Sequence, residues 1–194
     1  DLQPDFIWIK NRTDGSTNHH AVNTSIGSTR NLFVNKIDYE EGQAQSVKSI
    51  QSDGFTLGTW DGDNVNAKNF VAWQWKANGG TTTSVSASGT GSGCVNASTH
   101  QTDTTAGFSI ITYTGRDDQL NNGQHSLLKH GLGVVPTFII LKRRDATADW
   151  YVMGKKVTSA SAYSNNEYLS LNDTDAINGN SYTGSVAPTS TDIY

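Results

Sequence analysis

Hydrophobic residues along this chain occur in short runs separated by stretches rich in Gly, Ser, Thr, Asn and Asp. Some runs alternate with polar residues and others are apolar throughout, whereas no helical period of 3.6 residues persists. We therefore predict β-strands and, at most, a short turn of helix around 20–29. The predicted strands are 5–10, 31–35, 54–58, 69–76, 107–114, 136–143, 149–153 and 167–171.

Two of these runs, FIWI at 6–9 and FIIL at 138–141, are apolar on both faces, as in the central strands of a two-layer fold. In the run 69–76, Val71, Trp73 and Trp75 share one face because side chains alternate along a strand. We expect Trp8, Trp73 and Trp75 to lie in the core. The pattern predicts an all-β fold in which two antiparallel sheets pack face to face as a β-sandwich.

An internal repeat relates the two ends of the chain. Residues 4–12 match 136–144, residues 32–35 match 169–172, and residues 53–55 match 192–194. The offset between the matches grows slightly, in turn-rich stretches where insertions cost little. Each match is weak alone, but three in the same order indicate a repeated unit.

The two copies are incomplete in different ways. The first continues into the strand 69–76, whereas the second ends at Tyr194 and is preceded by segments that the first lacks, 107–113 and 130–133. We interpret the chain as the back part of one unit followed by the front part of the next. Either neighbouring segments are absent from this sequence, or the two partial units complete one another.

The predicted domains are a first unit at 1–78, a linker at 79–105 and a second unit at 106–194. The linker is rich in Gly, Ser and Thr and contains no Lys, Arg, Phe, Trp or Tyr. Such a segment buries too little apolar area to offset its ordering entropy, which predicts a flexible connection or a long surface loop. The alternative is that it lies ordered along a neighbouring subunit.

Composition narrows the functional classes. Thr, Ser, Gly and Asn supply 79 of 194 residues and Glu only three, which disfavours helices. The net charge of −4 argues against nucleic acid as a partner. No apolar run is long enough for insertion into a membrane. Cys94 is the single cysteine, so no disulfide forms within the chain. Because the first residue is Asp, we expect the chain to begin inside a longer protein or after processing.

Several phrases resemble a known group of modules. They are PDFIWIK at 4–10, DGFTLG at 53–58, FVAWQWKA at 70–77, AGFSIITYTG at 106–115 and HGLGVVP at 130–136. They are similar to tandem modules in virion structural proteins of tailed bacteriophages, especially phages of marine bacteria. The resemblance implies a lectin/glucanase-like (jelly-roll or concanavalin-type) β-sandwich in a tail fibre or surface appendage. It implies no catalytic residues.

The chain also lacks the residue patterns of common catalytic sites. A glycoside hydrolase needs two carboxylates across a cleft, whereas Glu40 and Glu41 are adjacent in a polar loop and Glu167 stands alone. No G-x-S-x-G or H-E-x-x-H motif occurs. We interpret His19 and His20 as part of a polar loop, since adjacent residues seldom bind one metal ion. We therefore expect no enzymatic activity.

The candidate ligand-binding residues are Trp60, Asp61, Asp63 and Asn64. An exposed tryptophan beside carboxylate and amide groups is a pairing that sugar-binding sites use. Other interpretations remain open: the segment forms a hairpin loop, or Trp60 folds back over the edge of the sandwich. Asp61 and Asp63 also have near-alternate oxygens that suit calcium, but the segment is not an EF-hand, and we predict no metal site.

The partners we expect are other copies of this chain, in a homotrimer or larger array, other virion proteins, and host cell-surface glycans. The expected location is the exterior of the phage particle, and the expected function is that of a tail-fibre or appendage module. The alternative is a purely structural capsid decoration or tail adaptor that binds no ligand.

Overall fold

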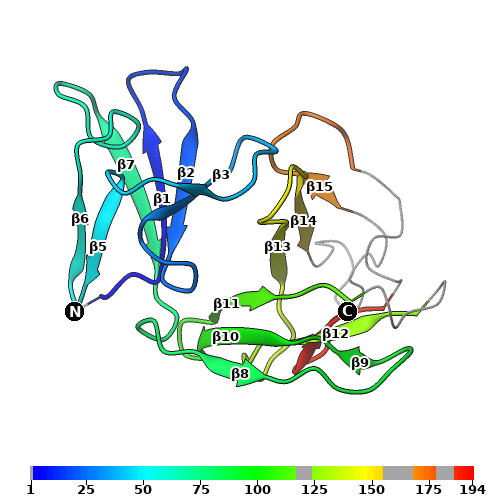
Figure 1. The fold of residues 1–194 in the computed structure, drawn as a ribbon. Coiled ribbons are helices and arrows are strands. Elements are labelled where there is room, and N and C mark those ends of the chain that lie inside the picture. The colour runs from blue at the N-terminus through cyan, green and yellow to red at the C-terminus, as the bar shows by residue number, and fades with distance from the viewer. Residues whose placement is uncertain (1, 117–123, 155–167, 178–185) are drawn as a thin grey trace. The chain divides into compact units, whose positions relative to one another are not determined.

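The computed structural model describes residues 2–116, 124–154, 168–177 and 186–194 (Figure 1). This described part contains strands and no helix, which confirms the all-β prediction. Every predicted strand overlaps an observed one, although residue 167 lies outside the described residues. These strands are β1 (Phe6–Asn11), β3 (Arg30–Phe33), β6 (Gly54–Leu57), β7 (Phe70–Trp75), β11 (Phe108–Tyr113), β13 (Phe138–Lys142), β14 (Trp150–Gly154) and β15 (Leu169–Ser170).

Other strands were not predicted. They are β2 (His19–Asn23), β4 (Glu41–Gly42), β5 (Val47–Gln51), β8 (Thr83–Val85), β9 (Cys94–Val95), β10 (Ser98–Asp103), β12 (Ser126–Lys129) and β16 (Asp192–Ile193). No helical turn forms at 20–29, and the prediction of a polar loop at His19–His20 is wrong, because β2 pairs with both β1 and β3. Pairing with neighbouring strands outweighs the weak local preference of this segment.

The expectation of a linker at 79–105 is also wrong. This segment forms β8, β9 and β10, and β10 pairs along its full length with β11. Cys94, which was expected in the linker, is buried in β9. The small side chains of this segment bury little apolar area, and the backbone hydrogen bonds to β11 keep β10 in an ordered conformation instead.

The chain divides into two compact units with different boundaries from those predicted. Unit 1 comprises residues 1–80, 142–150 and 171–174, and unit 2 comprises residues 81–141, 151–170 and 175–194. The tip of the β13–β14 hairpin therefore belongs to unit 1, although most of both strands belongs to unit 2.

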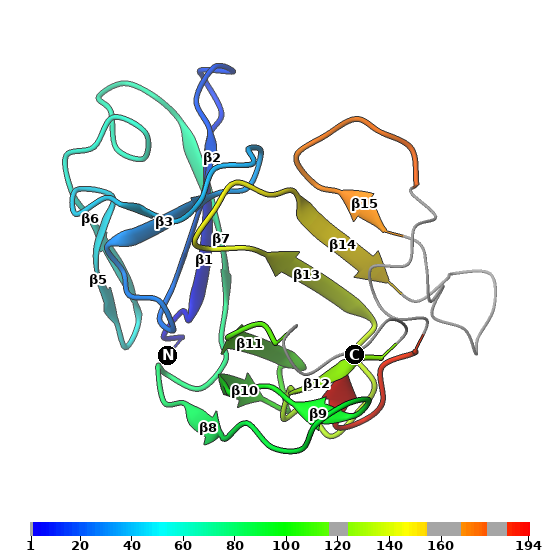
Figure 2. The ribbon, with the colours of Figure 1, turned by 45° about the vertical axis from the view of Figure 1, so that its right-hand side comes forward.

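Unit 1 is built on an antiparallel sheet with the order β4-β3-β2-β1-β7 (Figure 2). One face of the sheet packs against the β5–β6 hairpin. Ile7, Ile9 and Val22 from the sheet meet Val47 from the hairpin there, and all four side chains are almost completely buried. Because side chains alternate along β1, Ile7 and Ile9 lie on this face of the sheet, whereas Phe6 and Trp8 lie on the opposite face.

The opposite face of this sheet packs against the hairpin tip. Ala21, Leu32 and Val34 form a cluster with the buried Trp150. The indole nitrogen of Trp150 donates to the carbonyl oxygens of Phe33 at 2.9 Å and Lys36 at 3.1 Å. A buried indole needs such a partner, so these bonds fix the position of the tip in unit 1.

Unit 2 contains three small sheets. Their orders are β11-β10-β8, β16-β12-β9 and β13-β14-β15. All the pairings described are antiparallel except that of β12 with β9. The core of this unit includes Leu128, Ile139, Met153 and Ile193.

The internal repeat corresponds to a repeated strand order, because β1-β2-β3 and β13-β14-β15 are both antiparallel meanders. The hydrogen bonds at the two turns also agree. Asn35 Oδ1 accepts from the backbone N–H of His19 at 2.8 Å, and Asn172 Oδ1 accepts from that of Trp150 at 2.7 Å. These asparagines are aligned in the sequence match of 32–35 with 169–172.

Three further pairs of bonds follow the same correspondence. The amide of Val34 donates to the carbonyl of His19, and that of Leu171 donates to Trp150, each at 3.0 Å. The Asn35 and Asn172 amides donate to Asn18 and Asp149, respectively. Lys10 Nζ donates to Thr17 O at 2.5 Å, and Lys142 Nζ to Ala148 O at 2.6 Å. The third sequence match differs: β6 pairs with β5, whereas β16 pairs with β12.

Candidate functional site

The predicted binding segment 60–64 forms a tight turn after β6. The amides of Asp63 and Asn64 donate to the Trp60 carbonyl at 3.1 and 2.9 Å. The indole of Trp60 packs on the ring of His20, with ring centroids 4.4 Å apart, and faces Phe33 at 6.4 Å. A Cβ on Gly62 would come within 2.9 Å of both His20 and Trp60, so only glycine fits between them. Trp60 thus folds back onto the domain.

Asp63 lies at the centre of a buried polar cluster. One carboxylate oxygen is hydrogen-bonded to His20 Nδ1 and the other accepts from Ser46 Oγ. Asp63 is 1% exposed, His20 2% and Ser46 0%. The carboxylate lies between the histidine and the serine, so the serine is bonded to Asp63 and not to His20, unlike the nucleophile of a catalytic triad, which is bonded to the histidine. The cluster stabilises the interior of unit 1.

The four predicted binding residues are therefore not brought together as one surface. The structure corrects the prediction for Asp63, whose oxygens are enclosed, and for Trp60, whose ring covers His20. Asp61 and Asn64 are exposed, and Asn64 Nδ2 donates to the Gly58 carbonyl at 2.7 Å. Within the described ranges, no group of three or more His, Cys, Asp or Glu residues could hold a metal ion.

A second buried carboxylate, that of Asp5, also stabilises the fold through hydrogen bonds within the protein. Its oxygens accept from the backbone amides of Ala77 at 2.7 Å, Gly79 at 2.9 Å and Gly80 at 2.8 Å. Thr24 Oγ1 adds a further bond at 2.9 Å. Four donors saturate the carboxylate, which ties the chain after β7 to the start of β1.

Unit 2 contains its own buried histidine, His130, which is 1% exposed. Its carbonyl accepts from Thr102 Oγ1 at 2.8 Å and Ser109 Oγ at 2.7 Å, and its Nε2 lies 3.2 Å from the Thr189 carbonyl. Burial lowers the pKa of His130, against the opposing effect of the Thr189 carbonyl. The carbonyl of His130 therefore bonds to β10 and β11, and its ring is neutral at pH 7.

Asp192 in the same unit pairs with Lys129 at 2.6 Å and accepts from Thr191 Oγ1 at 2.5 Å. Burial alone would raise the pKa of Asp192, but the bonds from Lys129 and Thr191 outweigh it, and the pKa lies below its ordinary value. Asp192 is thus an ionised partner of Lys129 at neutral pH.

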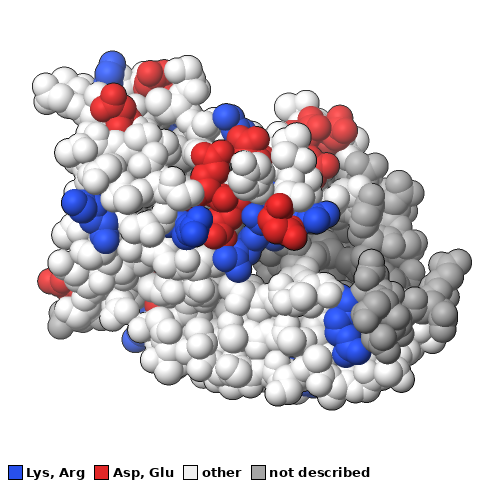
Figure 3. Space-filling view, viewed as in Figure 1, with Lys and Arg blue, Asp and Glu red and all other residues white. Residues whose placement is uncertain are grey.

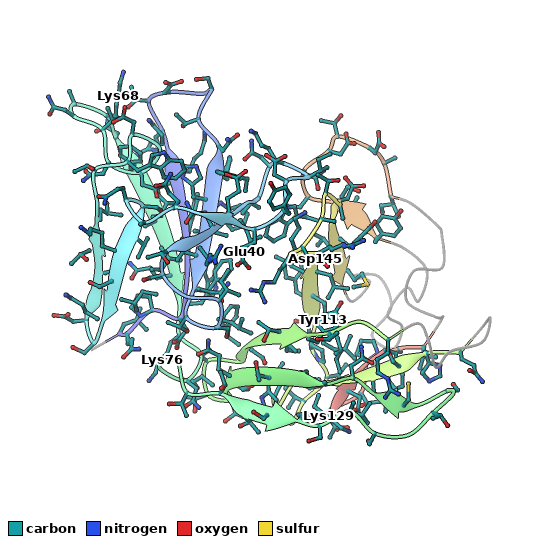
Figure 4. The ribbon with its side chains drawn as sticks, viewed as in Figure 1. Glu40, Lys68, Lys76, Tyr113, Lys129 and Asp145 are labelled. Carbon is teal, nitrogen blue, oxygen red and sulfur yellow. The ribbon has the colours of Figure 1, made fainter. Side chains whose placement is uncertain are left out.

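The surface carries scattered charges, and several of them form one group of mixed sign near the middle of the view in Figure 3. Arg144 Nε contacts Glu40 Oε2 at 2.5 Å, and Arg30 lies 3.7 Å from the same carboxylate. Glu40 and Asp145 are labelled near this group in Figure 4. The pairing of opposite charges leaves no single-sign patch in this group.

Exposed aromatic residues lie on β7 instead of the predicted loop. Trp73 is 45% exposed and Trp75 37%, so the expectation that both are core residues is wrong. β7 is an end strand of its sheet, and β1 pairs with it along one edge. Trp73 contacts Trp8 edge to face at 5.9 Å, and Trp75 contacts Phe6 at 5.5 Å.

Sequence reasoning missed the buried role of His20 and the exposed role of Trp73. His20 and Val22 lie on the same face of β2, because side chains alternate along a strand. This alternation indicates a half-buried strand, but the residues around the segment are polar and made the pattern hard to recognise. The alternation of Trp73 and Trp75 gives their common face but does not tell whether another element covers it.

The fold and these polar clusters define an all-β protein whose buried histidines and carboxylates bind its own backbone and side chains. The chain belongs to the family described as Domain of unknown function (DUF7483), whose sequence model matches residues 1–194. No curated protein and no solved structure matches this chain. No helix of the described part is long and apolar enough to cross a membrane.

Proposed function

We propose that this chain is a non-enzymatic structural module of a bacteriophage virion, within a tail fibre or another surface appendage, and that it contacts host surface glycans. The all-β fold, the low charge and the surface rich in Thr, Ser and Asn support a module of this kind. Its copies assemble with one another and with other virion proteins on the exterior of the particle, as a trimer or larger array.

The single observation that carries the glycan contact is the exposure of Trp73. An indole that is half exposed on a rigid strand can stack on the apolar face of a sugar ring. Lys10 lies on the same face of the sheet, opposite Val71, and could donate to sugar hydroxyl groups. Trp73 therefore replaces Trp60 as the proposed stacking residue.

The absence of activity is proposed from the state of the acid and base groups. Asp5, Asp63 and His130 are buried and hydrogen-bonded to the protein itself, so none of them faces a substrate. General acid–base catalysis requires a group within hydrogen-bonding reach of the substrate. The described part of the chain places these groups where they stabilise the fold.

A glycan array tests the proposal. Wild-type protein should bind a defined set of surface glycans, and Trp73→Ala should lose most of that binding. Tyr113→Ala is the matched control, because Tyr113 is also 45% exposed but lies in unit 2. Equal loss in both variants, or loss in neither, would contradict a site at Trp73.

Incubation with host polysaccharide should release no reducing ends over hours, and release abolished by Asp61→Asn would indicate an enzyme.

The alternative function is a capsid decoration or tail adaptor without a ligand. The paired charges around Glu40 and the open strand edges would suit contacts between virion proteins. Binding to no glycan, together with a stable trimer or larger array in light scattering, would favour this alternative. A stable monomer at micromolar concentration would count against the trimer or larger array that both proposed functions require.

A further inference from the structure

We propose that the outer edge of β13 binds an extended segment of a different polypeptide chain by strand addition. The segment carries large aromatic side chains at alternate positions, as β7 does. This interaction surface is separate from the glycan contact, and neither depends on the other.

Backbone alternation shows which residues of β13 point outward. The amide of Leu171 donates to Trp150 O, so Trp150 faces β15, and the next residue of β14 faces β13. The amide of Glu40 donates to Arg144 O at 2.9 Å, and Arg144 corresponds to Arg12, whose amide donates to Asn69 O on the β7 side of β1. By alternation, Phe138, Ile140 and Lys142 direct their backbone groups to this outer edge. No strand among the described residues pairs with it.

The side chains along this edge are apolar and exposed. Phe138 is 61% exposed and Ile140 37%, and they share one face of the strand. Val134 and Val135, just before the strand, are 61% and 46% exposed. An open strand edge with an adjoining apolar group favours pairing with another chain, and proteins usually block such edges unless they use them.

The first copy of the repeat shows what occupies the same edge. Phe6 and Trp8 in β1 correspond to Phe138 and Ile140, and β1 is paired along its whole length by β7. Phe6 lies opposite Trp75 and Trp8 opposite Trp73, with ring contacts at 5.5 and 5.9 Å. A strand of the β7 type would therefore cover Phe138 and Ile140 with two aromatic rings.

Charge at the end of the edge favours the same occupant. If the register of β1 with β7 is continued from Asn11 and Phe70, Lys68 lies opposite Thr13. The residue that corresponds to Thr13 in the second copy is Asp145, whose side chain is 79% exposed. Lys68 and Lys76 lie at the two ends of β7 (Figure 4). A lysine before the added strand would thus lie beside this carboxylate, which Arg143 also contacts at 2.7 Å.

The intact β7 of another molecule of this chain fits less well. Its inner edge is bonded to its own β1, since the Arg12 amide donates to Asn69 O at 2.7 Å. Its outer edge presents Phe70, Ala72 and Gln74, so pairing there would set Ala72 and Gln74, not the tryptophans, beside the exposed side chains of β13. The added strand therefore comes from a different polypeptide.

The test uses a fluorescent peptide of residues 68–77, KNFVAWQWKA, and the full chain. Anisotropy should show saturable binding to wild type and to Leu169→Lys, a control at an exposed position of β15. Ile140→Lys should weaken binding about tenfold or more, because a charge at the edge blocks pairing. A peptide with both tryptophans replaced by serine should also bind more weakly. Phe138→Ser is a second edge variant, and circular dichroism checks the fold of each.

Three results would overturn the proposal. The first is no binding up to the solubility limit of the peptide. The second is equal binding by wild type, Ile140→Lys and Phe138→Ser, which would mean that the peptide displaces β7 from β1. The third is a wild-type dimer in sedimentation that Ile140→Lys converts to monomer, which would make another copy of this chain the occupant. Glycan binding is measured separately, so its failure leaves these results unaffected.

Discussion

The hairpins β1–β2 and β13–β14 share their turn hydrogen bonds but differ in their surroundings. Both have a lysine that donates to a carbonyl across the turn and an asparagine that receives a backbone amide from the second strand. β1 lies inside a five-stranded sheet, whereas β13 ends a three-stranded one. A short sequence motif therefore determines the turn, and the neighbouring strands determine which side chains are buried.

The largest difference between the copies is the polar cluster beside β2. Asp63→Ala would leave His20 and Ser46 without their buried partner, and the free energy of unfolding should fall by about 3–5 kcal/mol. Urea unfolding followed by tryptophan fluorescence measures the change. Asp61→Ala, at an exposed position in the same turn, should change stability by about 0.5 kcal/mol or less. Equal effects would contradict a structural role for the cluster.

Equivalent isoleucines compare the two cores. Ile7→Ala and Ile139→Ala each remove three carbons from a buried side chain, which costs about 2–5 kcal/mol. Ile7 is 0% exposed between the sheet and the β5–β6 hairpin, while Ile139 is 7% exposed on an end strand. We expect the larger loss for Ile7→Ala, measured by the same unfolding experiment. A larger loss for Ile139→Ala would show that β13 is the better packed strand.

The repeat and the strand class could be predicted because both are local properties of sequence. Alternation identified β7, and the match of residues 4–12 with 136–144 identified two equivalent strands. The exposure of Trp73 and the burial of Asp63 could not be predicted, because each depends on segments far away in the chain. Ser46 and His20 enclose Asp63 from distant positions, and no residue near 63 carries that information.

The strands at 79–105 were missed for a related reason. Ser, Thr and Gly give weak local preference, and β10 is defined by its pairing with β11. The position of Trp60 was missed for the same reason: it was chosen because no apolar run surrounds it, yet the ring packs on a histidine from β2.

The asparagines test whether the shared turn is equally important in both copies. Asn35→Ala and Asn172→Ala each remove an acceptor for a backbone amide, and each should cost about 1 kcal/mol. The loss should be larger for Asn172→Ala, because Asn172 also donates to the carboxylate of Asp149 at 2.9 Å, whereas Asn35 donates to the neutral Asn18 at 3.2 Å. Thermal unfolding of the two variants in parallel measures the difference. No loss of stability in either variant would contradict a stabilising role for these shared hydrogen bonds.

A smaller effect, on the pH dependence of stability, also distinguishes the two copies. The first copy has His19 where the second has Trp150. Burial, with help from Lys10 and His20, lowers the pKa of His19 below its ordinary value of 6.5. The unfolded chain therefore binds a proton more readily, and stability should fall as pH falls from about 7 to 5. His19→Gln should reduce this slope but not abolish it, because burial also lowers the pKa of His100 and His130. An unchanged slope in urea titrations would contradict the prediction.

Amide hydrogen exchange measures the difference between the two edges most directly. The amide of Trp8 faces β7 and that of Ile140 faces the open edge, whereas the Ile139 amide faces β14 and serves as the control. Nuclear magnetic resonance should show slow exchange at Trp8 and Ile139, and exchange faster by about a hundredfold or more at Ile140. Equal protection of Ile140 and Trp8 in the isolated protein would contradict an open edge on β13.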